Sequence, residues 1–211
     1  MLSLFHAPGT CSLASCITLE EIREENGAEF EVNKVSFANG DQHKPEYLRI
    51  NPKGRVPALL TEEGILTETP AILLYLAQRY PEASLAPLDD IFALAQLQSF
   101  NNFLCSTVHV AHAHRFRGSR WANEQSSLDD MNAKVPENMT ALFIQIEETY
   151  LSGSEDNPWV MGANYTVSDA YLYTIARWLE GDGVDVAALP RVNAHIKRME
   201  NRPAVQRAIA R

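Results

Sequence analysis

The first 35 residues carry the pattern that most restricts the fold of this chain. Two short apolar runs, residues 2–5 and 30–35, flank a segment in which apolar residues recur at helical spacing from Leu13 to Ile22. Asn26-Gly27 is a stop signal for that helix. A helix that joins two strands of one sheet favours parallel pairing and a right-handed connection. This stretch therefore predicts a strand–helix–strand unit.

The next 45 residues predict two more strands and another helix. Residues 45–48 predict a short helical or irregular piece. The apolar runs 56–60 and 65–66 are separated by a loop that contains Gly64, which predicts a hairpin. Thr69 is then the predicted N-cap of a helix that has Pro70 at its first position and ends near residue 80.

The composition changes after this region, where strand signals nearly vanish. Residues 81–89 contain two prolines and are interpreted as a linker. Helical patterns then cover residues 91–116, 131–151, 168–179 and 192–210, the last with an interruption near Arg202-Pro203. We expect an α/β domain at residues 1–80, a linker at 81–89 and an all-helical domain at 90–211.

Charge and composition narrow the function classes. The net charge of −9 would repel phosphate backbones and anionic lipid, so nucleic-acid and membrane partners are disfavoured. With no basic leader and no apolar run long enough to span a bilayer, we expect a cytoplasmic protein. The three cysteines are then expected to be reduced thiols. No glycine-rich nucleotide motif occurs in the sequence.

Cys11 follows Pro8-Gly9-Thr10 at the point where the first strand gives way to the helix. Free N–H groups and the positive end of the helix dipole stabilise a thiolate there, so Cys11 is a candidate nucleophile or sulfur-binding residue. The alternative is a cysteine packed under the first turn. Residue 14 is alanine, so there is no CxxC pair and any redox chemistry would use one thiol. Ser12 could donate its hydroxyl to a bound thiolate, or could only cap the first turn.

Two further segments have the chemistry to hold an amino acid or a peptide. Glu68-Thr69-Pro70 places a carboxylate, a hydroxyl and free N–H groups at one helix start. It could bind both ends of an amino acid, or be only a helix cap with an acidic residue beside it. Val56-Pro57 raises the question of a cis peptide, which would offer the backbone of Val56 to an extended ligand; most X-Pro bonds are trans.

The helical half offers mainly structural signals. Thr166-Val167-Ser168-Asp169 predicts a capping box at the start of a core helix. His109, His112 and His114 are candidate metal ligands, but only the first two share a helical face, so hydrogen-bonded or solvated histidines are favoured and no metal is expected. The arginines that follow, at 115, 117 and 120, are interpreted as a solvated helix end that could also meet an anion.

Four stretches, in this order and spacing, resemble the cytosolic glutathione transferases, most closely the bacterial beta class. They are Pro8-Gly9-Thr10-Cys11-Ser12, Asn51-Pro52-Lys53-Gly54-Arg55-Val56-Pro57, Glu68-Thr69-Pro70 and Tyr165-Thr166-Val167-Ser168-Asp169. The resemblance implies a thioredoxin-like N-terminal domain, an all-helical C-terminal domain, and a homodimer with its active site between the domains. It also implies glutathione as co-substrate, with no other cofactor.

The resemblance assigns a role to each candidate residue. Cys11 contacts the glutathione sulfur, Val56 binds the cysteinyl backbone beside a cis Pro57, and Glu68 with Thr69 binds the γ-glutamyl end. Asn102 and His109 match the asparagine and histidine that the beta class supplies from its helical domain. Three positions depart from the family: His6 replaces a tyrosine, Val110 replaces a lysine after the histidine, and Lys44 is an insecure counterpart of a second lysine.

The sequence thus predicts an enzyme that conjugates the glutathione thiolate to small apolar electrophiles, with Cys11, Ser12 and His109 as catalytic residues. One alternative is a glutathione-dependent disulfide or peroxide reductase in which Cys11 forms a mixed disulfide. Another is a non-catalytic glutathione-binding module on the same fold. A zeta-class isomerase is disfavoured because the Ser-Ser-Cys motif is absent.

Overall fold

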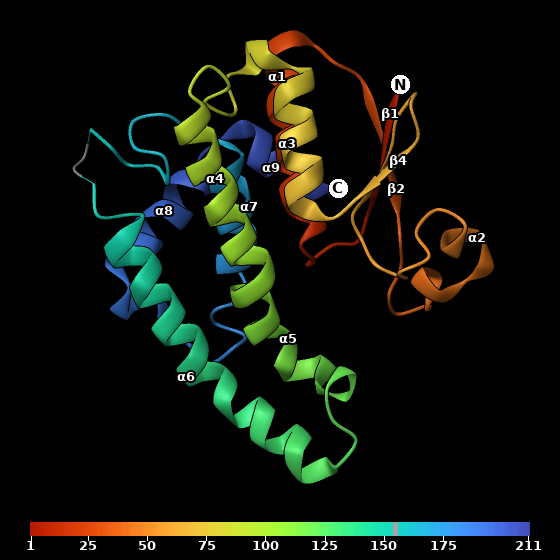
Figure 1. Cartoon of the computed structure of the whole chain (residues 1–211), viewed down its shortest axis with the longest axis vertical. Coiled ribbons are helices and arrows are strands. Elements are labelled where there is room, and N and C mark those ends of the chain that lie inside the picture. The colour runs from red at the N-terminus through yellow and green to blue at the C-terminus, as the bar shows by residue number, and fades with distance from the viewer. Residues whose placement is uncertain (154–155) are drawn as a thin grey trace. The chain divides into compact units, whose positions relative to one another are not determined.

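The computed structural model describes residues 1–153 and 156–211 (Figure 1). The chain forms two compact units. The first consists of Met1–Gln96 together with Met199–Arg211, and the second consists of Leu97–Arg198. The first unit therefore contains the end of the chain as well as its beginning.

The first unit is built on a four-stranded sheet in the order β2-β1-β3-β4. Its strands are β1 (Leu2–His6), β2 (Phe30–Lys34), β3 (Ala58–Leu60) and β4 (Ile65–Thr67). β1 pairs in parallel with β2 and antiparallel with β3, which pairs antiparallel with β4. The predicted strand–helix–strand unit and hairpin are both confirmed. β3 begins at Ala58, two residues later than predicted, directly after the Val56–Pro57 peptide.

The first unit also contains several helices. They are α1 (Ser12–Asn26), α2 (Pro45–Leu48), α3 (Thr69–Arg79), the first part of α4 (Ile91–Phe103), and α9 (Pro203–Ala210). Cys16, Ile17 and Ile22 of α1 are fully buried, as their helical spacing predicts. α1 ends as predicted at Gly27, whose φ of 73° is favourable only for glycine and whose N–H donates to the carbonyl of Arg23.

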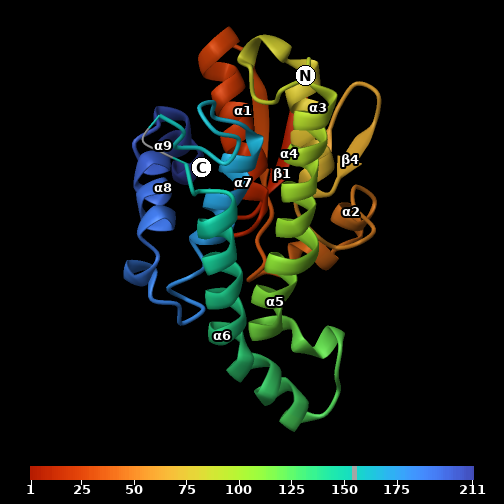
Figure 2. The ribbon, with the colours of Figure 1, turned by 60° about the vertical axis from the view of Figure 1, so that its left-hand side comes forward.

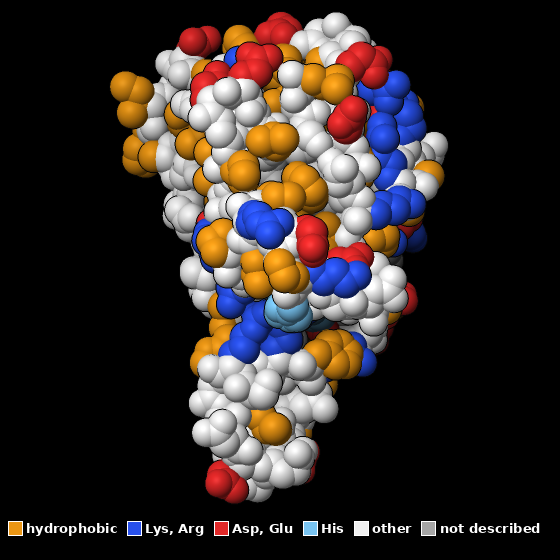
Figure 3. All heavy atoms as spheres, turned by 90° about the vertical axis from the view of Figure 1, so that its right-hand side faces the viewer, with side chains coloured by type: hydrophobic (Ala, Val, Ile, Leu, Met, Phe, Trp, Pro, Cys, Tyr) orange, Lys and Arg blue, Asp and Glu red, His pale blue; other side chains and the backbone are white. Residues whose placement is uncertain are grey.

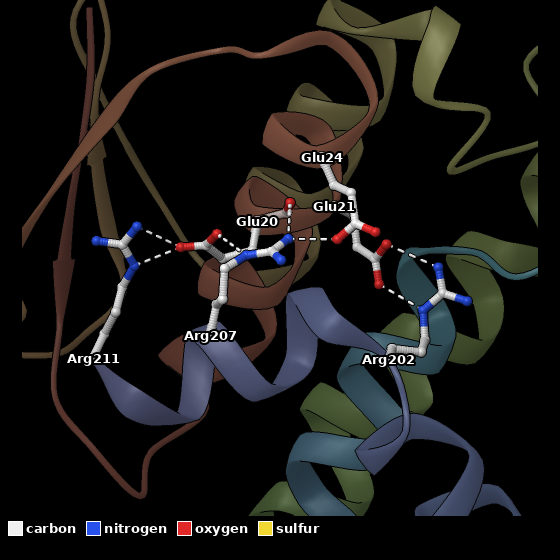
Figure 4. A network of polar contacts seen from close by, with 6 residues as sticks. All are labelled: Glu20, Glu21, Glu24, Arg202, Arg207 and Arg211. Carbon is white, nitrogen blue, oxygen red and sulfur yellow. Dashed lines mark hydrogen bonds and ion pairs between the residues drawn. The ribbon is translucent and has the colours of Figure 1, made fainter.

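The last helix, α9, packs against α1, which lies about 180 residues earlier in the chain (Figure 4). Arg202 forms two hydrogen bonds with Glu21, at 2.6 and 2.8 Å. The Glu20 carboxylate, which is fully buried, accepts hydrogen bonds from Arg207 (3.0 Å) and Arg211 (2.6 Å). These charged pairs join the two ends of the chain into one unit. We refer to Glu20, Glu21, Glu24, Arg202, Arg207 and Arg211 as the α1–α9 ion-pair network.

The second unit is helical in the part that the structure describes. It contains the end of α4, a π-helical turn (Leu104–Val108), α5 (His109–Arg117), α6 (Gln125–Thr149), α7 (Val167–Ala176) and α8 (Pro190–Glu200) (Figure 2). The helix predicted over 91–116 is therefore interrupted by the π turn. The sequence predicted that this helix starts at residue 131, but α6 starts at Gln125. The first residues of α6 are mostly polar and exposed, so no apolar pattern marks them as helical.

The predicted capping box at the start of α7 is confirmed. The backbone N–H of Ser168 donates to the Thr166 hydroxyl (3.3 Å), and the N–H of Thr166 donates to the Asp169 carboxylate (2.9 Å). Asp169 also accepts hydrogen bonds from the Val160 N–H and from His195 Nε2. Every residue of α7 is buried, so this cap fixes the central helix of the unit. Among the described residues, no helix is long and apolar enough to cross a membrane.

Candidate active site

The turn between β1 and α1 presents Cys11. Cys11 is the residue that immediately precedes α1, and its side chain is half-buried. Its Sγ lies 3.4 Å from the carbonyl oxygen of Val56. The thiol therefore sits at a helix start, where free N–H groups and the helix dipole favour negative charge on sulfur. The sequence placed Cys11 at this strand-to-helix junction, and the structure brings it next to Val56.

Ser12 organises the inside of the same turn. It is fully buried, and its Oγ lies 2.7 Å from both His6 Nδ1 and Thr10 Oγ1. The N–H of Ala7 also donates to this oxygen, at 3.2 Å. Burial lowers the pKa of His6 to about 4, the Ser12 contact opposes that shift, and the charge of Lys34 adds to it. His6 is thus neutral at physiological pH, and it fills the position where the beta class has a tyrosine.

The loop that faces Cys11 contains the Val56–Pro57 peptide, which is cis as the resemblance implies. Tyr47 Oη and Asn51 Nδ2 each donate to the carbonyl of Arg55 at 2.6 Å and so anchor the loop. Burial raises the pKa of Tyr47 to about 12, which keeps its phenol a hydrogen-bond donor. Sequence reasoning missed Tyr47 and Asn51, because neither pattern nor spacing shows which carbonyl they reach.

A glycine is required in this loop. Gly54 has a φ of 62°, and a Cβ there would lie 3.2 Å from both the Gln42 carbonyl oxygen and His43 Nδ1. The Asn-Pro-Lys-Gly turn seen in the sequence therefore has a steric reason for its last residue.

Glu68 and Thr69 lie at the start of α3. Glu68 is the residue before the helix, with a φ of 72°, and Thr69 is its first residue. The predicted N-cap is thus wrong by one residue, because Glu68 adopts a backbone conformation that side chains rarely take. The Glu68 side chain is exposed, whereas Thr69 is buried.

Lys53 is a charged neighbour of Glu68 that sequence reasoning missed. Its Nζ lies 2.5 Å from Glu68 Oε1 and 2.8 Å from Thr67 Oγ1. The only sequence signal was its place in the same Asn-Pro-Lys-Gly turn. The carboxylate expected to bind an ammonium group therefore already holds one from the chain itself.

The second unit holds the two remaining candidates. Asn102 is exposed on α4, and its carbonyl accepts a hydrogen bond from the Ser106 hydroxyl at 2.8 Å. His109 is the first residue of α5, is half-buried, and lies with its ring centroid 5.0 Å from that of Trp178. The neighbouring Asn101 is buried and accepts a hydrogen bond from Ser168. The structure thus distinguishes the two adjacent asparagines, and leaves Asn102 as the one open to a ligand.

The other histidines and cysteines have structural surroundings. His112 binds Asp182, at 2.7 Å, and His114 packs edge-on against Trp121. In residues 1–153 and 156–211, no three His, Cys, Asp or Glu side chains are grouped so as to hold a metal ion. Cys16 is fully buried, and burial raises the pKa of its thiol to about 12. Cys16 is therefore an unreactive packing residue.

Lys44, the insecure counterpart of a family lysine, is paired within the chain. Lys44 Nζ pairs with Asp41 at 2.5 Å on the surface. On the face of the molecule drawn in Figure 3, basic and acidic side chains are interspersed with apolar ones.

Two family models match the chain. The glutathione S-transferase N-terminal domain matches residues 1–78, and the glutathione S-transferase C-terminal domain matches residues 112–210. Glutathione S-transferase GstA of Escherichia coli O157:H7 is 32% identical over 216 residues, which cover 99% of this chain and 98% of that protein.

Solved structures agree with these matches. A glutathione transferase homologue from Sulfitobacter, with bound glutathione, is 46% identical with a TM-score of 0.91, and the match covers 98% of this chain and 96% of the other. The beta-class glutathione S-transferase of Sphingomonas chungbukensis is 33% identical with a TM-score of 0.83, over 99% and 97% of the two chains. The sheet, the cysteine turn, the cis-proline loop and these matches together show that the chain belongs to the glutathione S-transferase family.

Proposed function

We propose the roles that individual residues have in the glutathione transferase activity of this chain. The observation that carries the proposal is the position of Cys11 at the start of α1, with its Sγ 3.4 Å from the carbonyl of Val56 beside the cis Pro57. A thiol-containing peptide that paired with the backbone of Val56 would place its sulfur next to that helix start. In this position, the sulfur of bound glutathione lies next to groups that stabilise its thiolate form.

Three groups stabilise the thiolate in this proposal. The N–H groups and dipole at the start of α1 favour negative charge, and the Cys11 thiol donates a hydrogen bond to the glutathione sulfur. His109 donates a second hydrogen bond. Ser12 contributes by ordering the turn through its contacts with His6 and Thr10. Because the thiolate is the nucleophile, a lower pKa of the bound thiol raises the reactive fraction directly.

The two ends of the substrate are held by different residues. Glu68 binds the γ-glutamyl ammonium, while Thr69 and the N–H groups at the start of α3 bind the carboxylate. Asn102, which belongs to the helical domain, also binds glutathione in this proposal. The sulfur then attacks an electrophilic carbon of a small apolar compound: a C–S bond forms, and a leaving group departs with its electron pair, or a proton adds when the electrophile is an enone. No redox change occurs.

We further propose the organisation that the resemblance implies. In this division of the sequence, residues 1–80 are the glutathione-binding domain, 81–89 the linker and 90–211 the domain that lines the electrophile site, although α9 packs in the first compact unit. The chain forms a homodimer in the cytoplasm, where glutathione is kept reduced. Ile91 and Phe92, exposed by 88% and 73% in the single chain, are apolar side chains that a partner subunit could cover.

The test is glutathione-dependent turnover against a panel of halide, epoxide, enone, peroxide and disulfide substrates. Cys11→Ala should lower kcat by about tenfold while leaving glutathione affinity within a few-fold, because it removes one charge-assisted hydrogen bond to the thiolate. Cys16→Ala is the matched control, since Cys16 is a buried cysteine in the helix that Cys11 precedes. An unchanged rate in Cys11→Ala would contradict the assigned role.

One outcome would favour the reductase chemistry. If Cys11 acts covalently, exposure to oxidised glutathione adds one glutathione to the intact mass of the wild type and of Cys16→Ala, but not to that of Cys11→Ala. Under the transferase mechanism proposed here, none of the three proteins gains that mass.

A further inference from the structure

Asp182 forms a buried polar centre in the second unit, in the turn that follows α7. Its side chain is fully buried. Its carboxylate contacts His112 Nδ1 at 2.7 Å and accepts from Arg115 Nη1 at 3.4 Å. Its backbone N–H donates to the carbonyl of Trp178 at 2.9 Å. A buried carboxylate is costly unless it is paired and hydrogen-bonded, so this aspartate depends on these partners.

The ring of His112 connects Asp182 to Trp178. The imidazole stacks on the indole, with centroids 4.2 Å apart and an interplanar angle of 20°. His109 also lies against that indole, with its ring centroid 5.0 Å away and an interplanar angle of 53°. His109 and His112 are themselves 6.4 Å apart. The three rings therefore form one cluster, in which His112 stacks on the indole, His109 lies tilted against it, and Asp182 binds the His112 ring.

The turn is built so that Asp182 and Arg115 can meet. A Cβ at Gly181 would lie 3.0 Å from Arg115 Nη1, so a side chain there would displace the guanidinium. Gly183 has a φ of 80°, a backbone conformation that L side chains rarely adopt. The glycines on both sides of Asp182 thus allow its backbone and its neighbours to take their observed places.

We propose that Asp182 and His112 are positioning residues for His109. This inference rests on the proposed function, in which His109 donates to the glutathione sulfur. Asp182 fixes the orientation of the His112 ring, the ring fixes the indole of Trp178, and the indole limits the directions that the His109 side chain can take. The benefit is entropic: a donor already held in its reactive direction loses less freedom in the transition state. Neither Asp182 nor His112 needs to touch the substrate.

The experiment compares variants on α5 with a variant at Asp182, in the turn that follows α7. His112→Ala removes the stacked ring, and His112→Phe keeps a ring that can stack but cannot bind Asp182. Asp182→Asn keeps the shape and removes the charge. The matched control is His114→Ala, because His114 also lies on α5 and packs against a different indole, that of Trp121, at 4.6 Å and 81°. Each protein is measured for kcat and for both KM values with the electrophile that the wild type conjugates best.

The expected result separates catalysis from folding. His112→Ala should lower kcat by about tenfold with the KM for glutathione unchanged, His112→Phe should recover part of that loss, and His114→Ala should retain the wild-type kcat. With Trp121 and Trp159 replaced by phenylalanine, the emission of Trp178 should shift and become more accessible to acrylamide in His112→Ala and in Asp182→Asn. A purely structural role would lower the melting temperature and leave kcat per folded molecule unchanged.

Two results would overturn the inference. One is a wild-type kcat in His112→Ala together with unchanged Trp178 emission. The other is an equal loss of kcat in His114→Ala, which would show a general effect of changes in α5. A wild-type protein that conjugates no electrophile would instead contradict the proposed function, and the emission of Trp178 would still report whether Asp182 and His112 hold the stack.

Discussion

Lys53 forms an ion pair with Glu68, whose carboxylate we expect to bind the ammonium group of glutathione. Its Nζ lies 2.5 Å from Glu68 Oε1, and both side chains are about half exposed. The incoming ammonium must therefore displace the lysine before it can pair with Glu68. Exposed ion pairs contribute roughly 0.2–1 kcal/mol, so this competition is small but measurable.

Replacing Lys53 by methionine should strengthen glutathione binding. Loss of the competing ammonium leaves Glu68 free, and the dissociation constant measured by calorimetry should fall by up to about fivefold. Lys134→Met is the control, because Lys134 forms an exposed pair with Glu137 in the other unit. Weaker binding in Lys53→Met would mean that Lys53 itself contacts a carboxylate of glutathione.

His6 should make stability depend on pH. Burial holds its pKa at about 4 in the folded chain, below the ordinary value of 6.5. Between these values the unfolded state binds more protons, so the free energy of unfolding should fall as the pH falls from about 6.5 to about 4. The loss amounts to at most about 3–4 kcal/mol and is complete below the folded pKa.

Urea unfolding of the wild type and of His6→Gln at about pH 7 and about pH 4.5 tests this dependence. The variant should lose less stability between the two conditions, because it has no imidazole to protonate. His43→Gln, at an exposed histidine, should behave like the wild type. Equal slopes in His6→Gln and the wild type would assign the dependence to other groups.

Among the elements, the pairing of α1 with α9 gives the clearest contrast between buried and exposed charge. Glu20 and Glu24 lie one turn apart on α1 and both pair with Arg207, but the Glu20 side chain is fully buried whereas that of Glu24 is 47% exposed. Glu20→Ala leaves Arg207 and Arg211 without their shared buried partner, and should lower the free energy of unfolding by about 2 kcal/mol.

Glu24→Ala is the matched comparison and should cost less than about 1 kcal/mol. Both values come from urea unfolding of the full chain. Similar costs for the two variants would mean that the buried carboxylate contributes no more than a surface pair.

Elements were predictable from the sequence where their signals are local. The stop at Gly27, the capping box at Thr166 and the apolar runs of the first two strands lie within a few neighbouring residues. The turn of Cys11 was predictable for the same reason. The N-cap of α3 was misplaced because the unusual backbone of Glu68 leaves no trace in the residue types around it.

Long-range pairings left no such signal. Arg202 and Glu21 are 181 residues apart, and His112 and Asp182 are 70 apart. An arginine or aspartate in a polar helix or turn has the same sequence pattern whether it is solvated or paired. The spacing of the histidines along one helix therefore does not reveal that His112 pairs with Asp182, which lies in the turn that follows α7.

At the scale of the whole molecule, the first unit depends on the last residues of the chain. Ala204, Val205 and Ala208 of α9 are buried, in addition to the α1–α9 ion-pair network. A chain that ends at Arg202 should therefore expose apolar surface and the Glu20 carboxylate, and the melting temperature should fall by at least about 5 °C.

Calorimetry of the truncated chain, with glutathione binding measured in parallel, checks this expectation. An unchanged melting temperature would contradict it. A variant with Lys197→Ala, at the end of α8, controls for the loss of basic charge near this part of the chain.

The return of α9 to α1 also sets an order of events during synthesis. A ribosome delivers the strands and α1 to α3 first, but the helix that covers Glu20 and Glu21 emerges only after the whole of the second unit has been made. Until α9 has been synthesised, the face of α1 that it covers stays exposed. This interval is the time needed to translate the second unit and α9, on the order of ten seconds. For this chain the usual sequence, in which an N-terminal domain is finished before the next one begins, is reversed: the first unit to start folding is the last to be completed.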